Sequence, residues 1–390
     1  MTIADQKTPG RPIEIEFEAS TGLPTANQEL LLIGRAASGA TGVNTVITIS
    51  NVGDPVAGQA EAETKFGVGS ELAKMVVAAI NSNLAAGRSN SPSIKCVPML
   101  STAVDFGTND AALTAAINTK AEFIVSPFDG TDTTLVNKLK NHCATVSGAQ
   151  RVENNQFGSI GVAANFNVAD PANLNAPDSQ YLSLVYMRDS APAITLGELA
   201  AAYAAALAGN AVPFNPVNNF VLGEIAAPVT ATDNLSIGAG LESETVLGKG
   251  WTPLKVKPNG EVAIVRSITT RITTNGVTAV QSYYDVQDFQ VLYYWRKTLW
   301  TRFNQTDLTN TKRSVKTART IKGEALRLAK IFEDNAMFQS VSQLATQFTV
   351  TSSLTDRNRF DVVTPVNVIP GLHVIATTIK ASTQFDTISV

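Results

Sequence analysis

The acidic loop at residues 129–132, with the sequence Asp-Gly-Thr-Asp, holds the side chains best placed to do chemistry. It follows an apolar segment at residues 122–125 that is typical of a strand, and open α/β sheets often bind ligands at such strand ends. An α/β enzyme or ligand-binding protein using this loop would be a discrete monomer or small oligomer. Turn formation and capping of the next helix explain the same residues without any ligand, and we favour that interpretation.

The other reactive groups do not form a catalytic pattern. The two histidines are His142, in a predicted helix, and His373, in a predicted strand, and we expect both to be structural. No HExxH, GxSxG, paired CxxC or GxxxxGK[ST] motif occurs, and the nearest match to the last, Gly248-Lys249, lacks the first glycine of a phosphate loop. We therefore expect no enzyme activity, no catalytic residue, no cofactor and no metal site.

Composition bounds the class of protein. The chain has 390 residues, of which 44% are hydrophobic and 16% charged, which indicates a globular protein of two or three domains. A net charge of −3 gives no electrostatic case for binding nucleic acid or anionic lipid. Cys96 and Cys143 lie far apart and are expected to be reduced thiols. No segment reaches the roughly 18 uninterrupted apolar residues of a membrane span, so we expect synthesis in a cytoplasm and no membrane insertion.

The elements that must position these groups alternate between strands and helices. Strands are predicted at residues 29–34, 43–49, 94–99, 122–125, 158–164 and 181–188, and helices at 59–66, 70–84, 110–118, 133–147 and 196–207, with Ser70 as a helix cap. This alternation indicates an α/β layer structure with a sheet that is at least partly parallel. Residues 212–250 are rich in Pro, Asn, Gly and Thr, so we place a domain transition there and begin a second domain near Trp251.

The second domain is expected to mix strands and helices. Asn275-Gly276 lies between β-rich runs at residues 262–273 and 277–284, which predicts a hairpin. A helix at 289–303 has a broad aromatic face that is typical of core packing. Further extended segments are predicted at 348–351, 357–363 and 372–379.

A second helix, predicted at residues 312–332, concentrates positive charge. Residues 296–330 contain ten basic and two acidic residues, a net charge of +8, which leaves −11 for the rest of the chain. Like charges at helical spacing repel one another, so this helix is either a solvated face or the contact site of an acidic partner. Its basic residues are Lys312, Arg313, Lys316, Arg319, Lys322, Arg327 and Lys330.

The chain begins and ends with extended segments. Residues 13–18 alternate apolar and acidic side chains, which puts Ile13, Ile15 and Phe17 on one face of a strand. A terminal strand must pair with another strand, within the chain or in another subunit, because its unpaired backbone amide and carbonyl groups would otherwise promote aggregation. The closing residues 385–390 are also read as extended.

Several stretches of sequence occur in an order that points to a known family. They are residues 66–73 (FGVGSELA) before an Ala-rich helix, residues 258–262 (PNGEV) with 266–270 (RSITT), residues 285–286 (DV) before 292–296 (LYYWR), and residues 356–360 (DRNRF). In these stretches the sequence resembles the contractile tail sheath proteins of Mu-like phages, which are related to bacteriocin and type six secretion sheaths.

The resemblance implies a mixed α/β (α+β) tail-sheath fold. It implies an outer α/β domain at residues 20–250, an inner C-terminal core domain at 251–380, and terminal arms at 1–19 and 381–390 that are donated to neighbouring subunits. Such strand donation adds main-chain hydrogen bonds between subunits. The arm residues expected to make these contacts are Ile13, Ile15, Phe17, Phe385, Ile388 and Val390.

The resemblance also implies a function and its partners. The chain would be the structural subunit of a helical sheath of stacked rings that surrounds a tail tube, contracts without consuming nucleotide, and drives the tube through a target cell envelope. Lys312, Arg313, Lys316 and Arg319 would face an acidic tube surface. The other expected partners are baseplate and tail terminator proteins, and the expected location is the virion tail, made in a host bacterial cytoplasm. The sheath of a type six secretion or other cell-encoded injection system is the alternative.

Overall fold

The structure of the chain is a computed structural model. It describes residues 28–40, 42–85, 92–166, 171–188, 192–210, 215–225, 242–274, 277–278, 285–305, 311–356 and 358–372. Both predicted arms, residues 1–19 and 381–390, lie outside these ranges with all six of their named contact residues, as does His373. The strand predicted at 372–379 also lies outside them, apart from its first residue.

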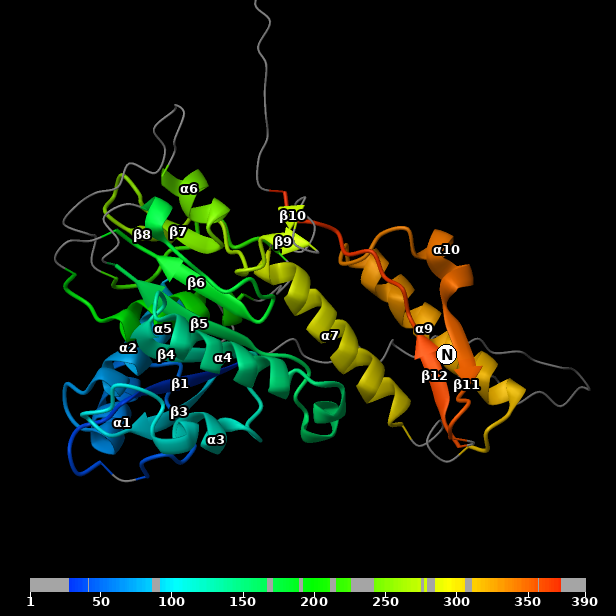
Figure 1. Ribbon diagram of the computed structural model, residues 1–390, viewed down its shortest axis with the longest axis horizontal. Coiled ribbons are helices and arrows are strands. Elements are labelled where there is room, and N and C mark those ends of the chain that lie inside the picture. The colour runs from blue at the N-terminus through cyan, green and yellow to red at the C-terminus, as the bar shows by residue number, and fades with distance from the viewer. Residues whose placement is uncertain are drawn as a thin grey trace, which may run out of the picture.

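An eight-stranded sheet forms the larger part of the structure, with strand order β2-β3-β1-β4-β5-β6-β7-β8 (Figure 1). Pairing is parallel from β3 through β1, β4, β5 and β6 to β7, whereas β2 and β8 join the edges antiparallel. The predicted mixed α/β class with a partly parallel sheet is therefore confirmed. The strands are β1 (Glu29–Arg35), β2 (Ile47–Ile49), β3 (Ser93–Met99), β4 (Phe123–Asp129), β5 (Ile160–Asn165), β6 (Leu182–Tyr186), β7 (Trp251–Val256) and β8 (Val262–Ile264).

Helices cover both faces of this sheet. In β1, Leu30 and Leu32 pack with α1, α2 and α5, whereas Leu31 and Ile33 pack with α3, α4 and α6, and all four side chains are fully buried. A parallel strand buried on both faces needs a continuous apolar run, which is what this segment of the sequence supplies. The helices are α1 (Pro55–Phe66), α2 (Glu71–Leu84), α3 (Ala111–Ala116), α4 (Thr133–Val146), α5 (Leu196–Ala208) and α6 (Glu242–Gly248).

Local sequence sets where the central helices begin. The Ser70 hydroxyl accepts a hydrogen bond from the Ala73 amide, so it caps α2 as predicted. Thr195 and Glu198 form a capping box at the start of α5. The Ala-rich sequence of α5 is buried almost throughout, because small side chains let it lie close to both α2 and the sheet.

The sheet continues past the predicted domain boundary. β7, which begins at Trp251, pairs in parallel with β6, and β8 pairs with β7. The predicted boundary at residue 250 therefore falls inside one sheet and is wrong as a structural division. Turn-rich composition at residues 212–250 signalled an irregular connection, but such a connection can return the chain to the sheet it left.

We call the sheet and its covering helices the sheet module. The C-terminal part of the chain forms a smaller unit with its own core, which we call the C-terminal module. The core of the C-terminal module consists of Val291, Trp295, Ala325, Leu328, Ala329, Phe332, Met337, Phe338, Val341 and Phe348. The aromatic rings pack closely, with the Phe332 and Phe338 centroids 4.9 Å apart. Its elements are α7 (Val286–Phe303), α9 (Val315–Asp334), α10 (Val341–Leu344), β11 (Thr349–Ser352) and β12 (Phe360–Val363).

Short elements complete the described chain. β9 (Thr273–Thr274) and β10 (Val277–Thr278) pair antiparallel on either side of residues 275–276, which confirms the predicted hairpin. Short 3-10 helices occupy Thr108–Asp110, Ala149–Asn154, Pro171–Asn173 and Ala345–Gln347. Within the described ranges, no helix has the length and apolar character needed to cross a membrane.

Candidate functional site

The helix α7 belongs to both modules (Figure 1). Val286 and Phe289 are part of the core under the sheet, whereas Val291 and Trp295 are part of the C-terminal core. A helix whose opposite faces are buried in different cores cannot swing relative to either without opening one of them. The aromatic face predicted at residues 289–303 therefore packs as core, as expected, and it joins two modules.

Polar contacts fix α7 to the sheet module near its start. Arg266 donates two hydrogen bonds to the Asp285 carboxylate, from Nε at 2.8 Å and from Nη2 at 3.1 Å, just before the helix begins. The Asp285 side chain is only 5% exposed, so this ion pair is largely removed from water. One turn into the helix, Gln290 Nε2 donates to Gln28 Oε1 at 2.9 Å, next to the first strand of the sheet.

Further along, α7 contacts the end of α4 and the turn before β5. The Arg296 guanidinium donates to the carbonyl oxygens of Ser147 at 2.7 Å, Gly148 at 2.5 Å and Phe157 at 3.1 Å. Two of these carbonyls lie just past the end of α4, where the negative end of the helix dipole favours a cation. Tyr293 lies so close to Gly158 that a Cβ at that position would come within 2.2 Å of its ring.

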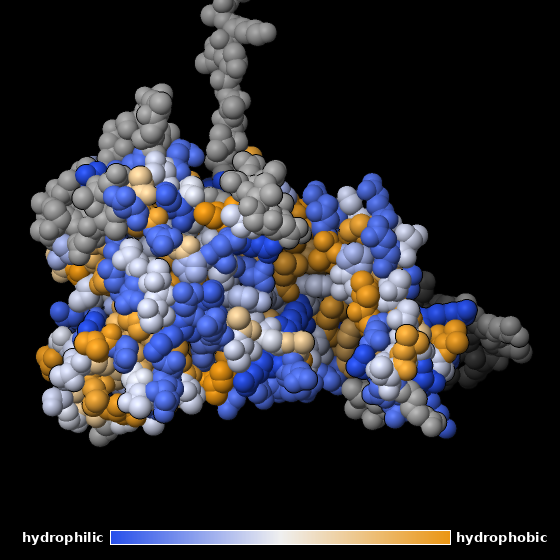
Figure 2. All heavy atoms as spheres, in the orientation of Figure 1, coloured by the Kyte–Doolittle hydropathy of each residue, from blue (hydrophilic) through white to orange (hydrophobic). Residues whose placement is uncertain are grey.

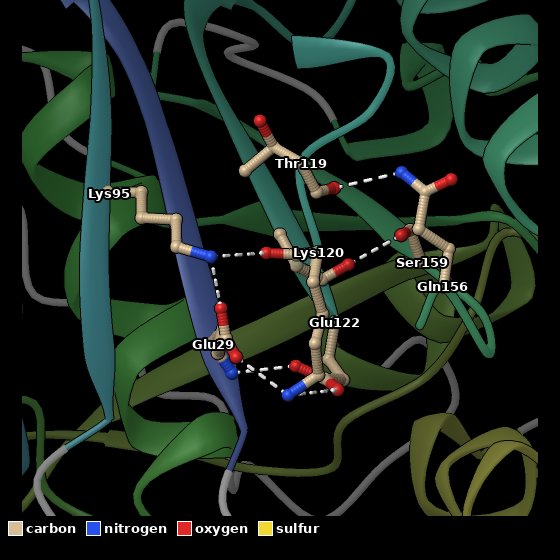
Figure 3. Close-up of polar contacts among 8 residues, drawn as sticks. Glu29, Lys95, Thr119, Lys120, Glu122, Gln156 and Ser159 are labelled. Carbon is tan, nitrogen blue, oxygen red and sulfur yellow. Dashed lines mark hydrogen bonds and ion pairs between the residues drawn. The ribbon is translucent and has the colours of Figure 1, made fainter. Parts of the chain in front are cut away.

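We call the contacts between α7 and the sheet module the α7 seam. A cluster of charged side chains lies beside it, near the ends where β1, β3 and β4 begin (Figure 3). The Glu29 carboxylate accepts hydrogen bonds from Lys95 at 2.5 Å and from Lys120 at 2.6 Å. Glu122 accepts one from the Glu29 backbone amide at 2.6 Å. We call Glu29, Lys95, Lys120 and Glu122 the charge cluster; all four side chains are between 16% and 23% exposed.

Burial and neighbouring charges move the pKa values in this cluster in opposite directions. Burial alone would raise the pKa of Glu29, but hydrogen bonds from Lys120 and Lys95 outweigh it and lower that pKa. The pKa of Glu122 is raised, because burial outweighs the attraction of Lys120. Lys297 of α7 lies close enough to take part: burial and then the Lys120 charge lower its pKa. The cluster thus links α7 electrostatically to the first residues of three strands.

Four of the predicted basic residues, Lys312, Arg313, Lys316 and Arg319, lie around the start of α9. This helix begins at Val315 because the Ser314 hydroxyl caps it, accepting from the Thr317 amide at 3.1 Å. The predicted start at residue 312 was therefore wrong by one turn, since a serine cap ends the preceding segment. Lys312 and Arg313 precede the helix, and Lys316 lies in its first turn. We call Lys312, Arg313, Lys316 and Arg319 the basic patch, and all four are exposed.

Pairing inside the chain divides the positive charge of α9 into two parts. Glu324 is bound by Arg302 and Arg327, both at 3.0 Å. Burial would raise the Glu324 pKa, but these two guanidinium groups outweigh it and lower that pKa. Within the described part of the chain, no carboxylate forms an ion pair with Lys312, Lys316 or Arg319. Cations at the first turn of a helix also oppose its dipole, so an acidic partner would stabilise this end of α9.

The basic patch lies beside a two-stranded antiparallel sheet formed by β11 and β12. Thr349 pairs with Val363 and Ser352 with Phe360, and the Arg313 guanidinium carbon lies 5.5 Å from the centre of the Phe360 ring. Among the described residues, neither strand pairs with a third one. Two strands alone make a marginal sheet, so its open edges are suited to receive further strands.

The rest of the visible surface offers less specific features. Figure 2 shows hydrophilic residues over most of the face in view, with hydrophobic residues scattered between them. The exposed large hydrophobic residues are Val46, Val56, Val68, Leu100, Val104, Val315, Leu354, Val363 and Leu372. Single exposed hydrophobic residues are normal on soluble surfaces and by themselves indicate no binding site.

The acidic loop at residues 129–132 has structural partners for both carboxylates. Asp129 Oδ1 accepts from the Thr131 amide and hydroxyl and from Asn165 Nδ2, each at 2.8 Å. Asp132 caps α4 by accepting from the Thr134 amide at 2.9 Å. The interpretation as a turn and a helix cap accounts for the contacts with Thr131 and Thr134, and Asn165 at the end of β5 binds the Asp129 carboxylate from the neighbouring strand.

The described histidine and the two cysteines are buried. Burial, and then the charge of Arg151, lowers the pKa of His142 to about 4, so this side chain is neutral in the folded protein at pH 7. Cys96 and Cys143 are free thiols, and burial raises both pKa values, which makes thiolate chemistry unfavourable. In the part of the chain that the structure covers, no group of three or more His, Cys, Asp or Glu side chains is arranged to hold a metal ion.

Sequence signals for these contacts differ in strength. The basic patch was found from charge composition, and the structure brings it beside β11 and β12. The charge cluster was missed, because Glu29, Lys95 and Lys120 are far apart in sequence and each is an ordinary charged residue at a strand end. The predicted arm contacts lie outside the described residues and stay predictions.

Comparison of the chain with known proteins gave matches at the level of structure. No protein-family model and no curated protein sequence matches it. Its structure is similar to a sheath tail protein from Desulfitobacterium hafniense, at 12% identity and a TM-score of 0.60, covering 92% of this chain and 100% of that one. A sheath tail protein from Listeria innocua matches at 10% identity and a TM-score of 0.62, covering 88% and 92%.

A helical assembly is also among the similar structures. The anti-feeding prophage sheath in its contracted state matches at 12% identity and a TM-score of 0.59, covering 96% of this chain and 99% of that one. The likeness thus extends over both the sheet module and the C-terminal module. The chain has the fold of sheath tail proteins.

Proposed function

We propose that this chain is the structural subunit of a contractile sheath, which polymerises helically around an inner tube and contracts to drive that tube through a target cell envelope. The observation that carries the proposal is the fold shared over almost the whole chain with a sheath solved in its contracted helical form. Sheath subunits of an extracellular contractile injection system have the same fold. In this role the chain is a structural subunit and not an enzyme.

Assembly would rest on the open edges of β11 and β12. Strands donated by neighbouring subunits, from residues 1–19 and 381–390, would extend this two-stranded sheet through main-chain hydrogen bonds. Such bonds depend little on side chains, so neighbours can tilt relative to one another while the pairing is kept. The seam along α7 supports this mechanism, because it holds the sheet module and the C-terminal module as one body while the links between subunits bend.

Contact with the tube would use the basic patch. Lys312, Lys316 and Arg319 are exposed and form no ion pair with a carboxylate of the described residues, which suits an acidic tube surface. Exposed ion pairs are each worth only about 0–1 kcal/mol, so a row of them can break one after another as the sheath widens. Baseplate and tail terminator proteins would close the two ends of the polymer, within the tail of a phage or a related injection particle made in a bacterial cytoplasm.

Negative-stain electron microscopy of the purified full-length protein tests the assembly. We expect hollow helical tubes of uniform width. Deleting residues 1–19 or residues 381–390 should each abolish these tubes while leaving a folded monomer by circular dichroism. Tubes of normal form from both truncated chains would refute the role of the arms, and small particles alone at high protein concentration would count against a self-assembling sheath.

The tube contact has a separate test. The double variant Lys316→Glu with Arg319→Glu should fail to assemble around a co-expressed tube protein. Its thermal stability should not fall, because both side chains are exposed and a carboxylate in the first turn of α9 interacts favourably with the helix dipole. The double variant Arg327→Glu with Lys330→Glu is the matched control, since both side chains pair within the chain, Arg327 with Glu324 at 3.0 Å and Lys330 with Glu333 at 2.7 Å. Equal loss of tube binding in the control would show that overall charge, and not the basic patch, governs the contact.

A further inference from the structure

Charged residues hold β1 at both of its ends. At its start, Glu29 is bound by Lys95 of β3, by Lys120 just before β4, and through its amide by Glu122 (Figure 3). At its end, Arg35 donates to both oxygens of Glu71, at 2.7 and 3.1 Å. The middle of this buried strand is held by apolar side chains, so its charged contacts with neighbouring elements are made at its two ends.

The position of β1 in the sheet determines how it responds to a pull. It lies between β3 and β4 and is parallel to both. Its pairing with β3 runs over its whole length, from Glu29 beside Ser93 to Arg35 beside Met99. A pull along the strand from its N-terminal end therefore loads all of these hydrogen bonds together, whereas a pull across the strand would open them one at a time.

The charge cluster is the first part of the sheet that such a pull reaches. Load on Glu29 passes through its carboxylate to Lys95 and Lys120, and through its amide to Glu122, so it is shared between the strands on both sides. Gln28 passes part of the load to Gln290 of α7. Breaking a partly buried ion pair leaves uncompensated charges in a poorly solvated place, which makes its rupture costly.

We infer that the charge cluster and Gln28 form a load-bearing root, which lets the chain N-terminal to residue 28 carry tension without pulling β1 out of the sheet. Its use in a sheath rests on the proposed function, because an arm that links subunits transmits force when the sheath changes length. The mechanical property itself belongs to the single folded chain and needs no polymer.

Single-molecule force spectroscopy at constant load tests this inference on the full chain. One handle is attached at the N-terminus and the other at position 104, where Val104 is 79% exposed in the loop beyond β3. This pair of points shears β1 against β3. A bio-orthogonal side chain at position 104 avoids the buried thiols. We expect Glu29→Gln and Lys95→Met each to shorten the lifetime of the folded state under load by about tenfold, equivalent to about 1.4 kcal/mol.

Two controls separate the load path from general destabilisation. Glu333→Gln and Lys330→Met remove an ion pair of α9 that lies outside this path, and their lifetimes should equal that of the unmodified chain. Pulling the cluster variants between positions 104 and 372 bypasses the start of β1 and should also leave the lifetime unchanged. Equal shortening in both geometries, or no shortening between the N-terminus and position 104, would overturn the inference. Tube formation by the same variants is scored separately and bears only on the proposed function.

Discussion

Replacing Arg296 with methionine tests whether α7 holds the two modules together. The substitution keeps the unbranched apolar stem and removes the guanidinium that donates to the carbonyls of Ser147, Gly148 and Phe157. Burial lowers the pKa of Arg296, because its surroundings solvate the charge less well than water does. The three carbonyl oxygens therefore supply much of the solvation that the guanidinium has lost.

The size of the effect follows from these contacts. A hydrogen bond to a charged group contributes about 1.5–3 kcal/mol to stability, and such contributions are not additive when they share a donor. Favourable interaction of a cation with the end of a helix contributes about 0.3–1 kcal/mol more. We expect Arg296→Met to lower the free energy of unfolding by about 2–4 kcal/mol, and Arg327→Met, which removes one exposed ion pair, to lower it by at most about 1 kcal/mol.

Equilibrium unfolding in urea, followed by tryptophan fluorescence, measures both modules separately. Trp251 is fully buried in the sheet module and Trp295 is buried in the C-terminal core. Two variants, each keeping only Trp251 or only Trp295 and carrying phenylalanine at the other two tryptophan positions, report on the sheet module and the C-terminal module, respectively. Because α7 lies in both cores, the two transitions should coincide in the starting chain and should shift together in Arg296→Met. A shift of the Trp295 transition alone, or a loss below about 0.5 kcal/mol in both, would refute the shared-helix reasoning.

Three further predictions concern single positions. Gly158→Ala should lower the melting temperature, by an amount equivalent to about 1–3 kcal/mol, because its new Cβ would overlap the ring of Tyr293; an unchanged melting curve would contradict this contact. Gly323→Ala, on α9 where nothing lies within 4 Å of the added carbon, should instead stabilise the chain by about 0.5–1 kcal/mol in the same assay. The folded-state pKa of His142 is lowered from 6.5 to about 4, so its neutral form contributes stability that is present above pH 6.5 and lost as the pH falls toward 4. In urea titrations at pH 7 and pH 4, His142→Leu should therefore lose less stability on acidification than the unmodified chain, and an equal loss would show that other groups dominate.

Much of the sheet module could be predicted from the sequence because its signals are local. Apolar runs give the buried strands, and Ser70 and Asp132 are capping residues whose role depends only on the next few positions. The predicted domain boundary was wrong for the same reason, because the turn-rich composition of residues 212–250 is a local signal and does not indicate which strand the following segment pairs with. Only the pairing of β7 with β6 shows that it returns to the same sheet.

The candidate sites divide in the same way. The basic patch was visible as composition, because its members are close together in the chain. The charge cluster and the α7 seam join residues separated by long stretches, such as Arg296 and Ser147, and no single segment carries a sign of that contact. Charged residues at strand ends are common, so only the assembled fold shows which of them meet.

The hydrogen bond between Gln28 and Gln290 spans 262 positions of the chain, and it bears on the order of folding during synthesis. A ribosome adds about 5–20 residues per second, so the partner of Gln28 emerges many seconds after the first strand. Throughout that interval β1 lacks the helix that will fix its first residues, and the root of the N-terminal segment stays incomplete. We therefore expect a nascent chain that stops before residue 285 to exchange the Glu29 amide hydrogen faster than the finished protein does. Pulse-labelled hydrogen exchange on stalled chains can measure this. Equal protection of the Glu29 amide in the stalled and the full-length chain would show that β3 and β4 are sufficient to protect it without α7. If the expectation holds, a subunit can bear load only after Gln290, of 390 residues, has been translated, which would disfavour assembly by chains shorter than this.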